Sequence, residues 1–114
     1  MATTVITSFP QADVALATWT SLVNGETGNS ASITRWSNNK TVTVTGTFGA
    51  GGSVAIQGSN DGSTFVPLHD PRGVAIAITT AGAALIEENP LFIRAVVTAG
   101  DGTTNLKVMI AAVT

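Results

Sequence analysis

The sequence contains no cysteine and no tyrosine, and only 11% of its residues are charged. Without cysteine, the chain has neither disulfides nor thiolate metal ligands. The charged fraction is far below the roughly 25% typical of soluble domains. Five Lys and Arg residues stand against seven Asp and Glu, and the cations are widely scattered along the chain. Because nucleic-acid binders need clustered cations to displace counterions from phosphates, we expect no nucleic-acid partner.

Long apolar stretches are absent as well. The longest stretch of low polarity, residues 74–86, is interrupted by Thr79, Thr80 and Gly82 and is too short to cross a bilayer. The chain begins Met-Ala-Thr-Thr-Val-Ile, without the basic and apolar regions of a signal peptide. We therefore expect a soluble protein with no membrane partner.

The clearest pattern in the sequence is an alternation over residues 41–48, Thr-Val-Thr-Val-Thr-Gly-Thr-Phe. A period of two places apolar side chains on one face and threonines on the other, which is typical of a half-buried strand. The small residues 49–52 predict a hairpin loop after it. This loop would return the chain into a strand over residues 53–57, with Val54 and Ile56 facing inward.

Turn sequences separate the other expected strands. Gly-Ser-Asn-Asp-Gly at residues 58–62 predicts a turn in which Gly62 has a positive φ angle. Residues 99–102, Ala-Gly-Asp-Gly, connect the last two strands, which we expect to form an antiparallel hairpin. The expected strands cover residues 12–23, 30–36, 41–48, 53–57, 65–68, 74–79, 83–87, 92–98 and 105–113.

No stretch shows a sustained helical period. A helical turn is the alternative for residues 12–23, where Thr18, Trp19 and Thr20 favour a strand. Short strands at regular spacing predict an all-β protein, an antiparallel β-sandwich or jelly-roll-like barrel. We place this single domain at residues 13–114 and expect residues 1–12 to form an N-terminal arm.

The polar residues form no catalytic or metal-binding pattern. His69 is the single histidine, and it precedes Asp70-Pro71, a pair that initiates turns. We interpret His69 as a surface or structural residue rather than as part of a proton relay or metal site. Asp61 and Asp101 lie in turn sequences that lack the spacing of a calcium-binding EF-hand. We therefore expect no enzyme activity, no catalytic residue, no metal and no cofactor.

Trp19 and Trp36 are the two tryptophans of the chain. Either ring could stack against a sugar, which would favour a carbohydrate-binding function. In a small sandwich, however, a tryptophan is more often part of the core or of an interface. We therefore name both as candidate interface residues.

Three segments resemble small structural proteins of tailed bacteriophages, namely residues 41–62 (TVTVTGTFGAGGSVAIQGSNDG), 89–94 (NPLFIR) and 99–108 (AGDGTTNLKV). The resemblance extends over about residues 19–113. Such proteins are often capsid decoration (cement) proteins, which bind the shell after it expands and commonly form trimers. Similar segments also occur in discoidin-like carbohydrate-binding sandwiches, and motifs that carry a fold do not separate a head protein from a tail protein.

The resemblance implies a virion structural protein that binds and stabilises the lattice of the major capsid protein. It further implies a homotrimer on the capsid surface, assembled in the host cytoplasm. The alternative is a phage tail or receptor-binding β module that contacts glycans through Trp19 or Trp36. Residues 3–9, most of which are β-branched, predict an extended segment that pairs with a neighbouring subunit or the capsid, with Val5 and Phe9 as apolar anchors. A frayed tail without a partner is the alternative for this segment.

Overall fold

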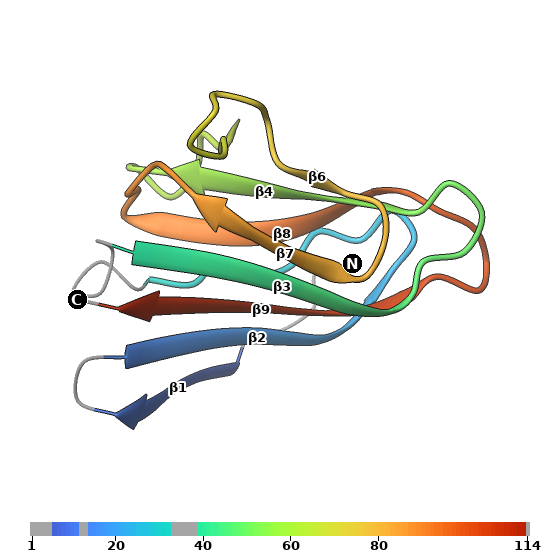
Figure 1. Cartoon of the computed structure of the whole chain (residues 1–114), viewed down its shortest axis with the longest axis horizontal. Coiled ribbons are helices and arrows are strands. Elements are labelled where there is room, and N and C mark those ends of the chain that lie inside the picture. Colours follow the sequence, from blue (N-terminus) through green and yellow to red (C-terminus); the bar gives the residue numbers. More distant parts are fainter. Residues whose placement is uncertain (1–5, 12–13, 33–38, 114) are drawn as a thin grey trace.

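The computed structural model describes residues 6–11, 14–32 and 39–113, and these residues form strands and connecting loops without a helix. Two antiparallel sheets pack face to face, so the predicted β-sandwich is confirmed (Figure 1). The strands are β1 (Ile6–Gln11), β2 (Val14–Val23), β3 (Asn39–Thr47), β4 (Ser53–Ser59), β5 (Val66–Pro67), β6 (Ala77–Ile78), β7 (Gly82–Ile86), β8 (Phe92–Ala99) and β9 (Asn105–Val113).

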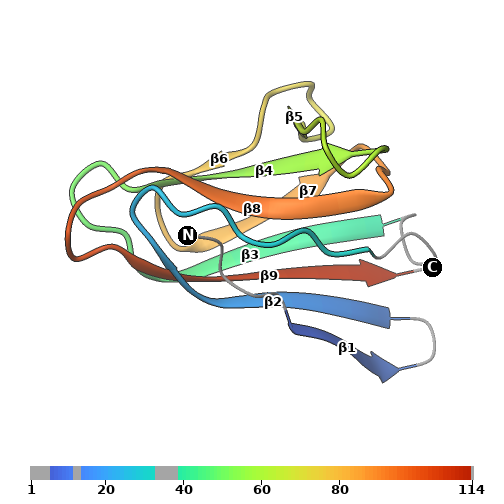
Figure 2. The same ribbon diagram turned by 180° about the vertical axis from the view of Figure 1, so that it is seen from behind.

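The first sheet has the strand order β1-β2-β9-β3-β7, and the second is centred on β4, which pairs with β8 along one edge. The short strands β5 and β6 follow each other along the other edge of β4. The segment from Thr27 to Ala31 bridges to Val96 and Ile93 of β8 (Figure 2). This segment therefore adds a short row to the second sheet.

Strand pairing in this sandwich is nested. β2 pairs with β9, the segment 27–31 with β8, β3 with β7, and β4 with β5 and β6. Among these pairs, strands early in the sequence thus pair with strands late in the sequence, and only the pairs in the middle of the sequence join strands that follow each other closely. As a result, most connections after β2 cross from one sheet to the other, and only the chain from β4 through β6 stays within one sheet.

The nesting shows that two predicted hairpins are wrong. β3 and β4 are consecutive, yet β3 lies in the first sheet and β4 in the second. β8 and β9 are separated in the same way. The loops 48–52 and 100–104 carry the chain across the end of the sandwich instead of turning it back within a sheet. Turn residues identify a reversal of the chain, but the burial of the apolar faces decides which strand becomes the partner.

The alternation along the strands builds the core between the two sheets. Val42 and Val44 of β3 are fully buried, and so are Val54 and Ile56 of β4, as their period of two predicts. The buried apolar core consists of Ala15, Ala17, Trp19, Leu22, Ala31, Val42, Val44, Val54, Ile56, Leu68, Ile76, Ile86, Ile93, Ala95, Val97, Leu106, Val108, Ile110 and Ala112.

Of the expected strand 65–68, only Val66 and Pro67 form a strand, and two longer expected strands are shortened more. Of residues 74–79, only Ala77 and Ile78 form a strand, while Val74 is 53% exposed. Of residues 30–36, the structure describes the first three, and among these only Ala31 makes a backbone bridge. Both segments lie at sheet edges, where a single neighbour fixes less of the backbone than two neighbours do.

Residues 6–11 of the expected N-terminal arm form β1, which pairs with β2 of the same chain at the edge of the first sheet. The register shifts between Ser8 and Gln11, and Phe9 falls between these two positions. Val5 lies outside the described residues. An edge strand keeps one row of backbone groups on its outer side, so pairing of this segment with another subunit stays a prediction.

Candidate functional site

Among the predicted interface residues, Trp19 is the one whose side chain the structure describes. It is fully buried, and its indole Nε1 donates to the carbonyl oxygen of Asn29 at 2.9 Å. The period of two in β2 turns Trp19 toward the core, so its ring has no face open to a sugar or a partner. This position corrects the prediction that Trp19 contacts either. Trp36 and Val5 lie outside the described residues, and of Phe9 only the backbone is described.

The loops 48–52 and 100–104 meet at one end of the sandwich, which we call the Asp101 end (right in Figure 1). The Asp101 carboxylate accepts the backbone N–H of Ala50 at 2.8 Å. It also accepts the hydroxyl and the backbone N–H of Thr103, at 2.6 and 2.8 Å. The Thr103 hydroxyl, followed by these backbone groups, lowers the pKa of Asp101 from its ordinary 3.8 to about 2. These neutral partners make the Asp101 end a structural brace.

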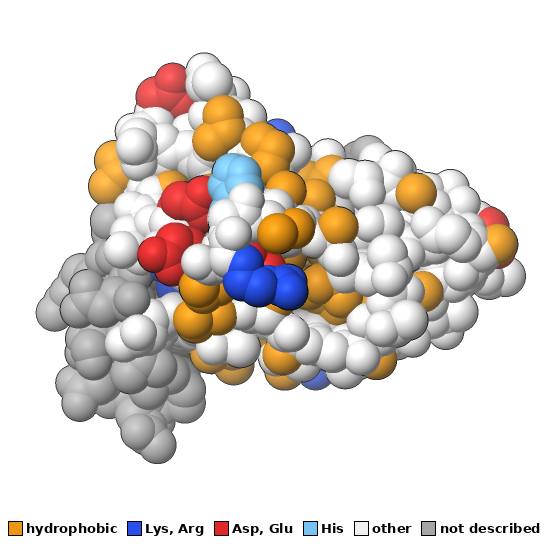
Figure 3. Space-filling model, turned by 45° about the horizontal axis from the view of Figure 1, so that its top comes forward, with side chains coloured by type: hydrophobic (Ala, Val, Ile, Leu, Met, Phe, Trp, Pro, Cys, Tyr) orange, Lys and Arg blue, Asp and Glu red, His pale blue; other side chains and the backbone are white. Residues whose placement is uncertain are grey.

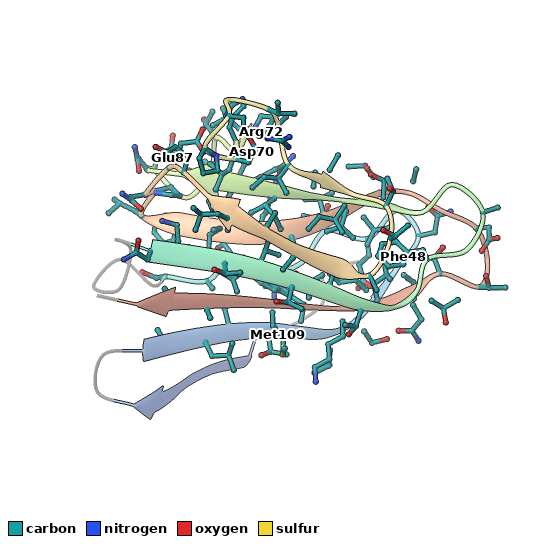
Figure 4. All side chains as sticks on the ribbon, viewed as in Figure 1. Phe48, Asp70, Arg72, Glu87 and Met109 are labelled. Atoms are coloured by element: carbon teal, nitrogen blue, oxygen red, sulfur yellow. The ribbon has the colours of Figure 1, made fainter. Side chains whose placement is uncertain are left out.

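The opposite end, which we call the Glu88 end, centres on a histidine–glutamate pair. Glu88 Oε1 accepts the backbone N–H of His69 at 2.7 Å, and Oε2 lies 2.5 Å from the imidazole Nδ1. The backbone N–H of Glu87 donates to the carbonyl oxygen of His69. The histidine (pale blue in Figure 3) lies beside acidic side chains, and Figure 4 shows Glu87 near the loop of Asp70 and Arg72.

The charge of Glu88 is set by these contacts. Burial raises the pKa of the Glu88 carboxyl, but the hydrogen bonds from His69 lower it by more, so it lies below its ordinary 4.5. The carboxyl is therefore ionised at neutral pH. The side chain of His69 is 42% exposed, which makes it a surface residue with a structural partner.

Lys40 places an amine inside the same end. It precedes Val42 by two residues on β3, so it points inward with it, and it is only 1% exposed. Its Nζ donates a hydrogen bond to Oδ1 of Asn89, the residue after Glu88. Burial lowers the pKa of Lys40 from its ordinary 10.5, and the negative charges of Glu88 and Glu87 offset part of that shift.

A pocket of about 500 Å³ opens between the turn after β4 and the segment that carries Glu88 and Asn89. Its walls are Gly58, Ser59, Asn60, Asp61, Thr64, Val66, Leu68, Glu88, Asn89 and Pro90. The acids in this wall already have partners. The Asp61 carboxylate accepts the backbone N–H groups of Ser63 and Thr64 at 2.7 Å each, and the Glu88 carboxylate accepts the backbone N–H of His69.

The turn beside this pocket is built as the sequence predicts. Gly62 has a φ angle of 81°, which confirms the expected left-handed conformation. The hydroxyl of Ser59 donates to Asp61 at 2.8 Å and accepts the backbone N–H of Gly62 at 2.9 Å. The backbone N–H groups of Thr64 and Ser63, with the Ser59 hydroxyl, hold the pKa of Asp61 far below its usual range.

In the described part of the chain, no three His, Asp or Glu side chains gather closely enough to hold a metal ion. His69 stands out in the sequence, whereas Lys40, Glu88 and Asn89, which lie at the same end of the sandwich, do not. One signal was available, because Lys40 occupies the inward-facing period of the strand that contains Val42. The contact of His69 with Glu88 has no local signal, since it depends on how β7 and the loop after β5 meet.

The outer face of the first sheet carries almost no charge. The described side chains of this face lie in cross-strand rows on β2, β9, β3 and β7, and we call this set the threonine face. The set consists of Leu16 and Thr18 of β2, Lys107, Met109 and Ala111 of β9, Thr41, Thr43 and Thr45 of β3, and Ala83 and Leu85 of β7. Lys107 is the one charged member. Leu85 is 45% exposed, and Met109, labelled in Figure 4, is partly exposed.

No protein-family model matches the chain, and no match was found among the curated proteins or among the solved structures. Within the residues that the structure describes, no helix is long and apolar enough to cross a membrane.

Proposed function

We propose that this protein is a structural protein of a bacteriophage virion that binds the major capsid protein lattice as a decoration (cement) protein. The resemblance of three sequence segments to small phage structural proteins supports the proposal. The threonine face is the structural observation that carries it. A decoration protein needs a stable scaffold and a contact surface rather than a reactive centre, because its role is to hold neighbouring subunits together.

The strand order supports a jelly-roll form of the sandwich. The nested pairing of β2 through β9, with the segment 27–31 as one row, is the order that two interlocked Greek keys produce. Jelly rolls occur in viral capsid domains and also in lectins. The fold therefore fits both a capsid role and a glycan-binding role, and only the side chains on the surface can distinguish the two.

The threonine face suits contact with a protein. Exposed Leu85 and partly exposed Met109 and Ala111 offer apolar contact, and removing such groups from water is favourable. The hydroxyls of Thr41 and Thr43 can donate or accept a hydrogen bond to a partner's backbone. Because the face holds a single charge, covering it carries little of the desolvation cost that buried ions impose.

We also propose that the protein assembles as a homotrimer on the capsid surface. Closed symmetric rings are the usual form of homo-oligomers, and a three-fold ring matches the local three-fold positions of a capsid lattice. The formal net charge of −2 gives little repulsion between copies. Light scattering at high micromolar concentration should give a trimer mass, and a monomer at that concentration would contradict this part of the proposal.

The glycan-binding alternative loses one of its two candidate rings. It depended on Trp19 or Trp36 stacking against a sugar; the ring of Trp19 is closed inside the core, and Trp36 lies outside the described residues. A glycan array with the purified protein would restore this alternative if it gave specific binding.

A matched pair of variants tests the capsid proposal. Ala83→Glu places a charge on the threonine face, and Ala77→Glu places the same charge on β6 in the other sheet; both positions are exposed. The probe is binding to expanded capsids that lack this protein. We expect Ala83→Glu to weaken binding about tenfold or more, because an unpaired charge would be desolvated at the contact. Ala77→Glu should bind like the unaltered protein.

Two outcomes would overturn the proposal in different ways. If the unaltered protein fails to bind such capsids, the decoration function is wrong. If it binds and both variants bind equally well, the threonine face is not the contact surface. Circular dichroism of both variants serves as the control for folding.

A further inference from the structure

Lys40 stands out because it is the one charged residue among the most deeply buried side chains that the structure describes. Full burial of a lysine is unusual, and the negative charges of Glu88 and Glu87 act on this one. Here Nζ contacts the neutral carboxamide of Asn89 through Oδ1. The two residues come from distant parts of the chain, because Lys40 lies in β3 and Asn89 lies in the segment after β7. They meet because β3 pairs with β7, with Lys40 opposite Ile86. The fold thus holds an amine against an amide carbonyl.

We propose that Lys40 and Asn89 join in an intramolecular isopeptide bond between Nζ and Cγ, with Glu88 as the group that carries the proton. The inference concerns covalent chemistry within the chain and does not depend on the proposed capsid function. It is a self-modification, so no substrate, metal or cofactor is needed.

Three features of this end favour the reaction. The first is proximity, since Nζ touches Oδ1 and therefore lies within reach of the carbon that carries it. The second is activation, because a buried amine loses its proton more readily, and the neutral amine is the nucleophile. The third is a carboxylate: Glu88 adjoins Asn89 in the chain, and its charge acts on Lys40.

The reaction balances without an oxidant or a co-reactant. The neutral Nζ attacks Cγ of Asn89, and a C–N bond forms as the carbonyl π electrons move to Oδ1. The Glu88 carboxylate accepts a proton from Nζ and returns it to Nδ2 of the carboxamide. The bond from Cγ to Nδ2 then breaks, the carbonyl re-forms, and ammonia leaves. Asn89 is exposed and lines the pocket, which gives the ammonia a route to solvent.

His69 holds Glu88 in place for this step. Both oxygens of the carboxylate are held by His69, one by its backbone N–H and one by its imidazole. His69 is therefore a positioning residue. The finished bond would tie β3 to the connection between β7 and β8 and would restrict the unfolded chain, as other cross-links do.

Intact-mass spectrometry of the denatured full chain tests the proposal directly. We expect a protein lighter than its sequence by one ammonia molecule. Trypsin does not cut after an acylated lysine, so Lys40 would be skipped. Residues 36–72 would then form one peptide, joined through the new amide to residues 73–94, which contain Asn89. A protein of full mass that trypsin cuts after Lys40 would overturn the proposal.

Two variants locate the bond. Lys40→Met removes the nucleophile while filling the same buried space, and it should restore the full mass. Lys107→Met removes an exposed lysine instead and should keep the lower mass. Asn24-Gly25 can also lose ammonia by closing to a succinimide, but that product gives no branched peptide. If the lower mass persists in Lys40→Met, the ammonia comes from elsewhere and the proposal fails.

A second matched pair tests the role of Glu88. Glu88→Gln keeps the shape of the side chain but cannot accept the proton, so the cross-linked fraction should fall severalfold. Glu87→Gln also removes a negative charge that acts on Lys40 but keeps Glu88, so it should cross-link at least as completely as the unaltered protein. Because the readout is the cross-linked fraction of protein that is folded by circular dichroism, loss of structure cannot mimic the result. Equal fractions in both variants would remove Glu88 from the mechanism.

Discussion

Each end of the sandwich has a carboxylate that accepts hydrogen bonds from the backbone, but the other groups around the two carboxylates differ. Asp101 binds the backbone of Ala50 and the groups of Thr103, all of them neutral. Glu88 binds the backbone and the imidazole of His69, and its charge reaches the buried amine of Lys40. The same carboxylate chemistry therefore has two consequences.

A carboxylate among neutral turn groups can fix the shape of a loop, and nothing more follows from it. A carboxylate that contacts an imidazole, and whose charge acts on an amine, can also exchange protons. We therefore expect the Asp101 end to be sensitive to changes of backbone shape and to acid. We expect loss of the side-chain contact between His69 and Glu88 to cost little stability, since both side chains are partly exposed.

The largest expected effect is at the Asp101 end. Gly49 has a φ angle of 72°, and a Cβ there would overlap Oδ1 of Asp101 and lie 2.7 Å from the hydroxyl oxygen of Thr104. Gly49→Ala should therefore lower the free energy of unfolding by about 3 kcal/mol, from backbone strain and displacement of the brace together. The midpoint of urea unfolding measures the loss.

Gly102→Ala is the matched control for that change. Gly102 lies in the facing loop, has no positive φ angle, and would place its Cβ in open space. Its substitution should change the free energy of unfolding by less than about 0.5 kcal/mol. Equal losses in Gly49→Ala and Gly102→Ala would show that the contact of the two loops does not hold the Asp101 end together.

A smaller loss is expected at the Glu88 end from Gly62→Val. Gly62 has a φ angle of 81°, but an added Cβ would lie 3.5 Å from the ring of Phe92, an ordinary contact. Strain of the backbone is then the single cost, about 1–2 kcal/mol. Gly82→Val, at a strand position without a positive φ angle, is the control and should leave the melting temperature almost unchanged. An unchanged melting temperature in Gly62→Val would contradict the role assigned to this turn.

Acid tests the role of the carboxylate at the Asp101 end. The folded pKa of Asp101 is depressed from 3.8 to about 2, so the folded state binds its proton less readily than the unfolded chain. Its contribution is therefore present above pH 3.8 and is lost as the pH falls toward 2. Asp101→Asn should melt below the unaltered protein at neutral pH, and the gap should close across this window. A gap that stays constant down to pH 2 would show that the carboxylate charge is not what holds Ala50 and Thr103.

Individual strands could be predicted from the sequence, and their partners could not. The alternation at residues 41–48 identified β3 and its buried face, because period two is a local property of the chain. The strands beside β3 are β7 and β9, which are distant from it in sequence, so its local pattern does not identify them. A glycine-rich loop permits both a hairpin and a crossing between sheets, so residues 49–52 carried no information on this choice.

The candidate site was less predictable than the fold. Lys40 and Asn89 meet because β3 pairs with β7, with Lys40 opposite Ile86, and no local sequence pattern predicts that pairing. Trp19 attracted attention as an aromatic residue, although its place in the alternation of β2 indicated burial. A residue's period within a strand therefore says more about its role than its chemical type does. A lysine at an inward-facing position of an apolar strand, such as Lys40, combines a buried position with a polar side chain and so indicates a site.

The smallest expected effect is at the centre of the Glu88 end. His69→Gln removes the imidazole from Glu88 Oε2, but glutamine keeps the backbone N–H that binds Oε1. Both side chains of the pair are partly exposed, at 42% and 39%, so water can replace the lost partner. We expect the free energy of unfolding to fall by less than about 1 kcal/mol, measured by urea unfolding at neutral pH. A loss as large as that of Gly49→Ala would mean that the His69–Glu88 contact is as much a brace as Asp101, and the contrast between the two ends would disappear.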